Sequence, residues 1–389
     1  MPEPHEAEAP PPDAGEPPMP PPHPFQGRKR ALLLLGAGFL LFQLALVLSV
    51  PASDAPPPLV EPPPAPAAVE QEIDVERLLN DLSAGAPHAL ILAAFAALNV
   101  LGMLAAWAGF SGWLLAPDLR ARLALGRFAD RAQPRVSALD LGAVVLLVFT
   151  ARILFLHALA RCTPAAWWEA VPGGWMPVGG AGLVASLAAQ FLGYAVALAG
   201  LVWAVRERDP ERAAAGIWPF WSNRTVAPPS NPAADVRLGL AAYFLLSWLL
   251  LAINAASQAF FKRFGMTPDE NPVLDILRDE TSASGSWLTV GLLVLAASLG
   301  AAVFEELLFR GLLYNVARRY LGPLPGALVA AFAFAGIHFV WSNFAALFVM
   351  ALALTWLYER TGRLLAPIVL HFVNNLLALV VTIALAHRG

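Results

Sequence analysis

The sequence contains a single cysteine, Cys162, among 389 residues. An intramolecular disulfide is therefore excluded, and so is a metal site built from several cysteines. Charged residues are also scarce, at 14% of the chain, and the formal net charge is -3. Because the arginines gather in a few connecting segments and form no basic face, no nucleic-acid partner is expected.

Apolar residues, in contrast, make up 58% of the sequence and occur in long runs. A run of about 20 apolar residues lets a helix cross a bilayer, and the alternating pattern of a membrane barrel is missing. The chain is therefore predicted to be an all-α, polytopic transmembrane helical bundle with about nine spanning helices. The predicted spans are 31–50, 88–116, 138–160, 180–205, 237–261, 287–314, 325–341, 343–358 and 364–386.

Composition divides the chain into three regions. Residues 1–30 are rich in Pro, Glu and Ala and are predicted to be a disordered cytoplasmic tail, because they cannot bury enough apolar surface to offset the entropy lost on ordering. Residues 31–236 form an N-terminal transmembrane region with four helices and an acidic, Pro-rich extracytoplasmic loop at 51–87. Residues 237–389 hold the remaining spans and form a C-terminal core.

The arginines predict the orientation, since cytoplasmic loops of membrane proteins carry an excess of Lys and Arg. The loops after the second, fourth, sixth and eighth spans are rich in arginine, with Arg318 and Arg319 in the sixth. The loop after the third span carries Arg161 alone. A multi-pass protein of the cell membrane with a cytoplasmic N-terminus and an extracytoplasmic C-terminus satisfies every loop.

Three charged residues stand together inside a predicted span, in the run EELLFR: Glu305, Glu306 and Arg310. Charges inside a bilayer are costly, so such a cluster indicates a functional site. On a helix Glu306 and Arg310 share a face, while Glu305 is turned about 100° away from its neighbour. Glu306 is therefore predicted to pair with Arg310, and Glu305, with no cation nearby in sequence, to act as a general base. A purely structural ion pair at a helix end is the alternative.

Two later spans carry histidines. His338 ends the run FAGIH, in which Phe334 lies four residues earlier on the same predicted helical face. His371 begins the run HFVNN, in which Asn375 lies four residues later. Taken singly, core packing or an interhelical hydrogen bond would explain each residue. At 1.5 Å per residue, however, Glu305, His338 and His371 lie roughly 13, 20 and 10 Å from the cytoplasmic boundary, so they can converge.

In order along the chain, EELLFR, FAGIH and HFVNN resemble the motifs EExxxR, FxxxH and HxxxN of the CPBP family of intramembrane proteases. This family includes the Rce1-type CAAX prenyl endopeptidases and the bacterial Abi proteins. The resemblance covers about residues 237–386, and mostly 287–386. It implies that residues 237–389 form a CPBP-type intramembrane protease core.

The resemblance also implies a role for each residue. Glu305 would activate a water molecule together with His338. His371 with Asn375 would stabilise the oxyanion of the tetrahedral intermediate. The residues that shape the site or engage the substrate would be Glu306, Arg310 and Phe334. No cofactor is certain, and zinc bound by Glu305, His338 and His371 stays open, because such a ligand set leaves one coordination position free.

The expected function is an intramembrane endopeptidase that hydrolyses a peptide bond of a membrane-associated protein or peptide, with CAAX-type processing implied by the resemblance. The expected partners are that substrate and the lipid bilayer. Two other functions remain open. One is a non-catalytic membrane scaffold or bacteriocin-immunity-like protein with the same fold. The other is a proton-coupled transporter in which Glu305, His338 and His371 form a relay.

Overall fold

The computed structural model describes residues 30–41 except 32, 35 and 39, residues 80–114 except 85, and residues 136–171, 174–205, 231–265, 277 and 287–386. The predicted tail at 1–30, apart from residue 30, and the predicted loop at 51–87, apart from residues 80–84, 86 and 87, lie outside this part of the chain. The arginine-rich loops after the second and fourth predicted spans lie outside it as well.

Four long helices come first in the described chain: α3 (Pro87–Leu114), α5 (Ala138–Cys162), α6 (Gly179–Val205) and α9 (Pro232–Arg263). Polar caps begin two of them. At α5, Ser137 and Asp140 form a reciprocal capping box. At α9, the Asn231 side chain accepts a hydrogen bond from the Ala234 N–H. These caps fix the residues at which the two apolar helices begin.

A short antiparallel hairpin joins α5 to α6. Its strands are β1 (Trp168–Val171) and β2 (Gly174–Pro177). The buried indole of Trp168 donates a hydrogen bond to the Thr163 hydroxyl at 2.7 Å, which holds the hairpin against the end of α5. The prediction of an all-α bundle holds for the rest of the described chain and missed this hairpin.

After α9 the described chain continues with one continuous helical run, Trp287–Leu321. It consists of α11 (Trp287–Leu295), the π-helical η2 (Ala296–Gly300), α12 (Ala301–Glu306), the π-helical η3 (Leu307–Leu313) and α13 (Tyr314–Leu321). The chain then forms α14 (Pro323–Gly336), the single turn η4 (Trp341–Asn343), α15 (Phe344–Thr361) and α16 (Leu365–Ala386).

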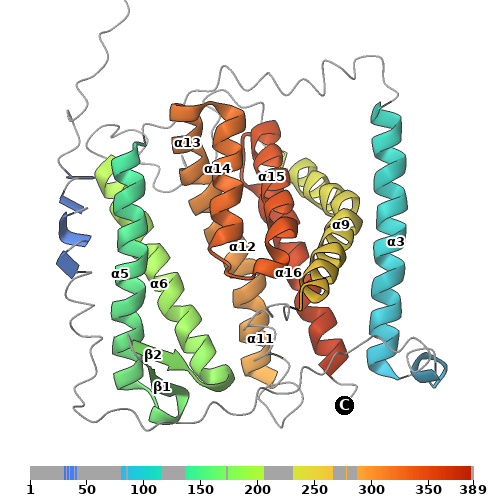
Figure 1. Ribbon diagram of the computed structural model, residues 1–389, viewed down its shortest axis with the longest axis horizontal. Coiled ribbons are helices and arrows are strands. Elements are labelled where there is room, and N and C mark those ends of the chain that lie inside the picture. The colour runs from blue at the N-terminus through green and yellow to red at the C-terminus, as the bar shows by residue number, and fades with distance from the viewer. Residues whose placement is uncertain are drawn as a thin grey trace, which may run out of the picture.

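The helices lie side by side in a bundle (Figure 1). α5 and α6 lie on one side, with the blue segment near residues 30–41 beyond α5, α3 stands at the opposite edge, and α11 to α16 lie between. α9 packs against α16 and α15, and it also contacts α3. The C-terminal core therefore occupies the middle of the described structure.

Small residues allow two of these helices to approach closely. A Cβ atom at Gly239 of α9 would lie 2.6 Å from the carbonyl oxygen of Ala366 and 2.8 Å from Cβ of Val369, both in α16. Those distances are shorter than real contacts, so only glycine fits at this crossing. Small residues at such crossings are the common means of packing helices in membranes.

An ion pair fixes the connection between α15 and α16. Arg363 donates from Nε and Nη2 to the two carboxylate oxygens of Asp235 in α9, at 2.6 and 2.7 Å. The hydrogen bond to Asp235 raises the pKa of Arg363 above its usual value. A cation whose pKa is raised on folding stabilises the fold at every pH below its unfolded pKa. The pair therefore ties α9 to this connection throughout the neutral pH range.

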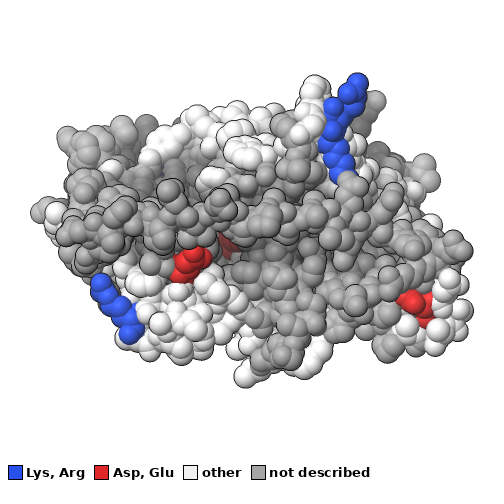
Figure 2. Space-filling model, turned by 60° about the horizontal axis from the view of Figure 1, so that its bottom comes forward, with Lys and Arg blue, Asp and Glu red and all other residues white. Residues whose placement is uncertain are grey.

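Six helices in the described part of the chain are long and apolar enough to cross a membrane: Ala138–Cys162, Gly179–Ala204, Pro232–Arg263, Trp287–Leu321, Trp341–Thr361 and Leu365–Ala384. Large apolar side chains such as Leu249, Leu251 and Leu288 are exposed on them. Figure 2 shows a described surface that is largely uncharged, with its charged side chains standing apart. The chain is a multi-pass membrane protein, and the predicted count of about nine spans is not confirmed.

The predicted span at 325–341 is wrong at its C-terminal end. α14 has 14 residues and ends at Gly336, and at 1.5 Å per residue it is about 21 Å long, short of the roughly 30 Å hydrocarbon core. Phe339 follows with a φ of 53°, in the left-handed region, which stops the helix and turns the chain toward α15. His338 consequently lies in a turn and not on a helical face.

Candidate active site

The two glutamates of the first motif end α12, between two π-helical segments. η2 precedes this short helix, and η3 follows it directly after Glu306. π-helical turns insert an extra residue per turn and occur frequently at functional sites. Glu305 and Glu306 therefore lie on a short α-helical stretch that has π-helix on both sides.

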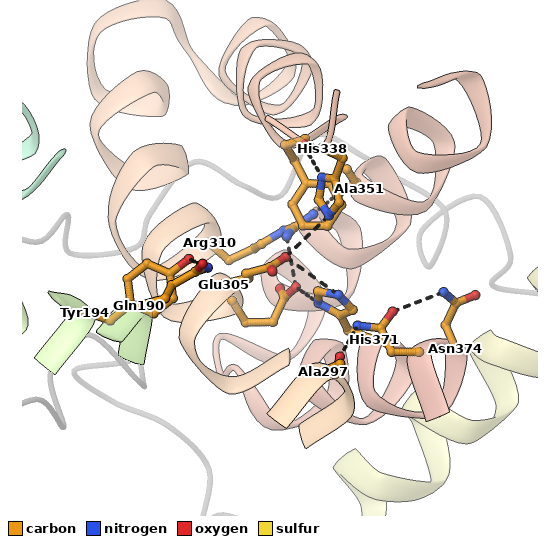
Figure 3. A network of polar contacts seen from close by, with 12 residues as sticks. Gln190, Tyr194, Ala297, Glu305, Arg310, His338, Ala351, His371 and Asn374 are labelled. Carbon is orange, nitrogen blue, oxygen red and sulfur yellow. Dashed lines mark hydrogen bonds and ion pairs between the residues drawn. The ribbon is translucent and has the colours of Figure 1, made fainter. Parts of the chain in front are cut away.

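Glu306 is completely buried, and one of its carboxylate oxygens accepts two hydrogen bonds. Arg310 donates from Nη1 to Glu306 Oε1 at 2.9 Å, and His371 donates from Nδ1 to the same atom at 2.8 Å. Arg310, also fully buried, donates from Nη2 to the carbonyl oxygen of Ala351 at 3.0 Å. This network joins α12, η3, α15 and α16, and Figure 3 shows its members Arg310, Ala351 and His371.

Glu305 has different neighbouring atoms from Glu306. Its Oε2 atom is buried and has no hydrogen-bond partner within the described residues. That oxygen lies 3.9 Å from Nε2 of His338 and 3.8 Å from Nε2 of His371. The structure thus places one carboxylate oxygen against the same ring atom of both histidines (Figure 3).

Both histidines are oriented through their other ring nitrogen. His338 donates from Nδ1 to the carbonyl oxygen of Phe334 at 2.7 Å, and His371 donates from Nδ1 to Glu306. A hydrogen bond at Nδ1 fixes the ring orientation and leaves Nε2 for chemistry. Although His338 has left the helix, this bond keeps it one turn from Phe334.

Phe334 forms the apolar wall between these groups. Its ring is fully buried and lies 4.8 Å from the His338 ring and 5.6 Å from the His371 ring, centroid to centroid. The guanidinium carbon of Arg310 lies 4.7 Å from the same ring, in a cation–π contact. Phe334 therefore touches both histidines and the buried cation.

Asn375 lies one helical turn after His371 in α16. It donates from Nδ2 to the carbonyl oxygen of Ala297 in η2 at 3.2 Å, and its Oδ1 accepts from Asn374 Nδ2 at 3.4 Å. Since the Nδ2 group carries two hydrogens, one stays available beside Ala297. The predicted oxyanion role of Asn375 stays a prediction.

Sequence reasoning missed a contribution from α6. Tyr194 stacks on Phe304, the residue before Glu305, with ring centroids 5.4 Å apart, and Phe191 stacks on it at 5.2 Å. Gln190 donates from Nε2 to the Tyr194 hydroxyl at 2.7 Å (Figure 3). The sequence signal that could have revealed this contribution is the presence of two polar residues, Gln190 and Tyr194, four positions apart in an apolar helix.

A second buried network was also missed. Arg318, predicted in a loop, lies buried in α13 and donates to Glu359 Oε1 at 2.7 Å. Tyr314 donates its hydroxyl to the same oxygen at 2.6 Å. The network ties α13 to α15 and thereby supports the helical run that carries the glutamates.

The predicted zinc ligands do not form a metal cluster. Within the described residues, no group of three or more His, Cys, Asp or Glu side chains is arranged to hold a metal ion. His371 uses Nδ1 for Glu306 and keeps Nε2 free, and Glu305 Oε2 lies 3.8 and 3.9 Å from the two histidine Nε2 atoms. Zinc at these three residues stays a prediction, and no step of the chemistry below uses a metal.

Comparison with protein families gives a match over part of the chain. Residues 287–377 match the family model described as "Type II CAAX prenyl endopeptidase Rce1-like". The match includes both glutamates, Arg310, both histidines and Asn375, and it leaves residues 1–286 outside. No curated protein and no solved structure matches the chain.

Proposed function

We propose that the Rce1-like domain at residues 287–377 makes this chain an intramembrane endopeptidase, since the family consists of intramembrane proteases. The substrate would be a peptide bond of a membrane-associated protein or peptide. The observation that carries the proposal is the position of the buried Glu305 Oε2, which faces Nε2 of both His338 and His371. A carboxylate between two imidazoles suits the removal of a proton from water.

The distances around Glu305 suit a water molecule as the nucleophile. Separations of 3.8 and 3.9 Å are too long for direct hydrogen bonds. A water molecule bonded at about 2.8 Å to Glu305 Oε2 can also bond Nε2 of His338. Glu305 takes the proton of this water while its oxygen attacks the carbonyl carbon of the substrate. The proton then passes from Glu305 to the leaving amine nitrogen as the C–N bond breaks.

His371 is assigned to the oxyanion. Its Nδ1–H donates to Glu306, so Nε2 is directed at the region beside Glu305. When the ring is protonated, Nε2–H donates to the oxyanion while the Glu306 carboxylate stabilises the imidazolium. Asn375 supplies the second donor through the free hydrogen of Nδ2. Hydrolysis of this kind consumes only water.

A comparison of protein termini tests the proposal. Membrane proteins from cells carrying the unaltered chain, Glu305→Gln or Glu169→Gln are compared for their N- and C-terminal peptides. Glu169 is an exposed residue of β1 and is the matched control for the loss of a carboxylate. At least one terminus is expected to be present with the unaltered chain and the control and missing with Glu305→Gln. Identical termini in all three would favour the scaffold function.

The membrane orientation of the chain can be tested by labelling Cys162. It is the only cysteine of the sequence, and it is exposed at the end of α5. With a cytoplasmic N-terminus, Cys162 faces the outside of the cell. A membrane-impermeant maleimide is therefore expected to label it in intact cells. In the variant Cys162→Ser/Tyr320→Cys, the exposed position in α13 is expected to react only after permeabilisation. The reverse pattern would contradict the proposed orientation.

A further inference from the structure

A cavity of about 390 Å³ lies beside the candidate site. Its walls come from α3, α9, η4, α15 and α16. The polar residues that line it are Asn99, Tyr243, Ser247, Asn254, Asn343 and Asn374, and the remaining lining residues are apolar. Its volume falls in the range of ligand pockets, roughly 300–1,000 Å³. Because its described lining contains amides, hydroxyls and apolar groups but no charged side chain, the cavity suits an uncharged occupant.

Two side-chain oxygens that line this cavity are hydrogen-bond acceptors. Asn254 Oδ1 and Asn343 Oδ1 are buried and have no hydrogen-bond partner within the described residues. A buried polar atom without a partner costs about 1–3 kcal/mol. Asn99 Oδ1, in contrast, accepts a hydrogen bond from the Tyr243 hydroxyl at 3.3 Å. An occupant with N–H groups would satisfy the two remaining oxygens.

The cavity and the candidate site share two helices. Asn374 of α16 lines the cavity and donates to Asn375, which belongs to the site. Met350 of α15 also lines the cavity, and the next residue, Ala351, accepts the hydrogen bond from Arg310. Figure 3 shows Asn374 at one end of the polar network and Tyr194 at the other. On α15 and on α16, a residue that lines the cavity is therefore next in sequence to a residue that belongs to the polar network of the site.

Peptide backbone is the occupant that fits these features. Non-helical backbone at membrane depth is tolerated only where protein surrounds it and satisfies its N–H and C=O groups. Carboxamides can do both, since each has an acceptor oxygen and two donor hydrogens. We infer that the cavity binds an unwound, uncharged segment of the substrate, whose N–H groups donate to Asn254 and Asn343. This inference rests on the proposed function.

Binding of a defined peptide to the Glu305→Gln protein in lipid nanodiscs tests the inference without any cleavage. The probe is a fluorescein-labelled peptide of leucine and alanine with a central Gly-Ser-Gly segment. The control peptide lacks this interruption. The matched variants are Ala346→Trp, which fills the cavity, and Ala345→Trp, whose side chain is exposed on the same helix.

The interrupted peptide is expected to bind more tightly than the control peptide. Ala346→Trp is expected to weaken its binding about tenfold or more, while Ala345→Trp leaves it unchanged. The pair Asn254→Leu and Asn343→Leu is expected to abolish the preference for the interrupted peptide. Equal binding by the two tryptophan variants would overturn the inference, as would a bound lipid that only Ala346→Trp displaces.

The proposed function can fail separately. If the peptide binds as expected but cells show no shifted terminus, the cavity is a peptide-binding site without hydrolysis. If a terminus does shift, and Ala346→Trp and Ala345→Trp made in the chain that keeps Glu305 process it at the same rate, the protease function stands and the cavity inference is wrong. Peptide binding and protein termini are measured in separate experiments, so failure of the cavity inference can be distinguished from failure of the proposed function.

Discussion

Purified protein carrying Glu305→Gln is expected to cleave its substrate about 100- to 10,000-fold more slowly than the unaltered protein, the range that a general base contributes. Glutamine keeps the size of the side chain but cannot take a proton from water. The fold is expected to be unaffected, because Glu305 Oε2 has no hydrogen-bond partner within the described residues. The rate is measured on a peptide that contains the bond found by the comparison of termini, and stability by thermal unfolding in the same detergent.

Glu306→Gln is the matched control, since it makes the same chemical change one residue later. Glu306 accepts hydrogen bonds from both Arg310 and His371. This variant is therefore expected to lose stability together with activity, whereas Glu305→Gln loses activity alone. Cleavage at the normal rate by the Glu305→Gln protein would contradict the mechanism.

Arg310→Met is expected to destabilise the protein by about 3–5 kcal/mol, the usual cost of removing one member of a buried ion pair. Methionine fills much of the same volume but leaves the Glu306 carboxylate buried beside His371 alone. It also removes the donor to the Ala351 carbonyl, which joins η3 to α15. The loss is measured as the shift of the unfolding midpoint in a titration of mixed micelles with SDS.

Two further variants show whether the effect comes from the ion pair. Arg161→Met, at the exposed end of α5, is expected to leave the midpoint unchanged. Arg310→Met combined with Glu306→Leu is expected to recover part of the loss, because replacing both partners by apolar groups removes the unpaired charge. A double variant as unstable as Arg310→Met alone would show that packing, and not charge, dominates at this position.

The sequence predicts the parts of the site that depend on local spacing. Glu306 and Arg310 are four residues apart, and their side chains meet at 2.9 Å although Arg310 lies in a π-helical segment. The depth of the motifs in their apolar runs also predicts that Glu305, His338 and His371 converge. Regular periodicity and hydrophobic length suffice for both results.

The orientation of the histidines could not be predicted in the same way. His338 lies beyond the end of α14, because Phe339 adopts a left-handed conformation without being a glycine. No sequence pattern marks such a residue. The ring directions depend on Nδ1 contacts to the Phe334 carbonyl and to Glu306, and the second of these joins residues 65 apart. The ion pair of Arg318 with Glu359, 41 residues away, was missed for the same reason.

The aromatic contacts of α6 decide how small a working protein can be. Phe304, the residue before Glu305, has Phe191 and Tyr194 stacked on it. A fragment that begins at Trp287, where the family match begins, would leave the Phe304 ring without these two neighbours. It would also lose Gln190, which bonds the Tyr194 hydroxyl. The shortest fragment that keeps the surroundings of the carboxylate intact therefore begins no later than α6, and a fragment made for the cleavage assay must include that helix.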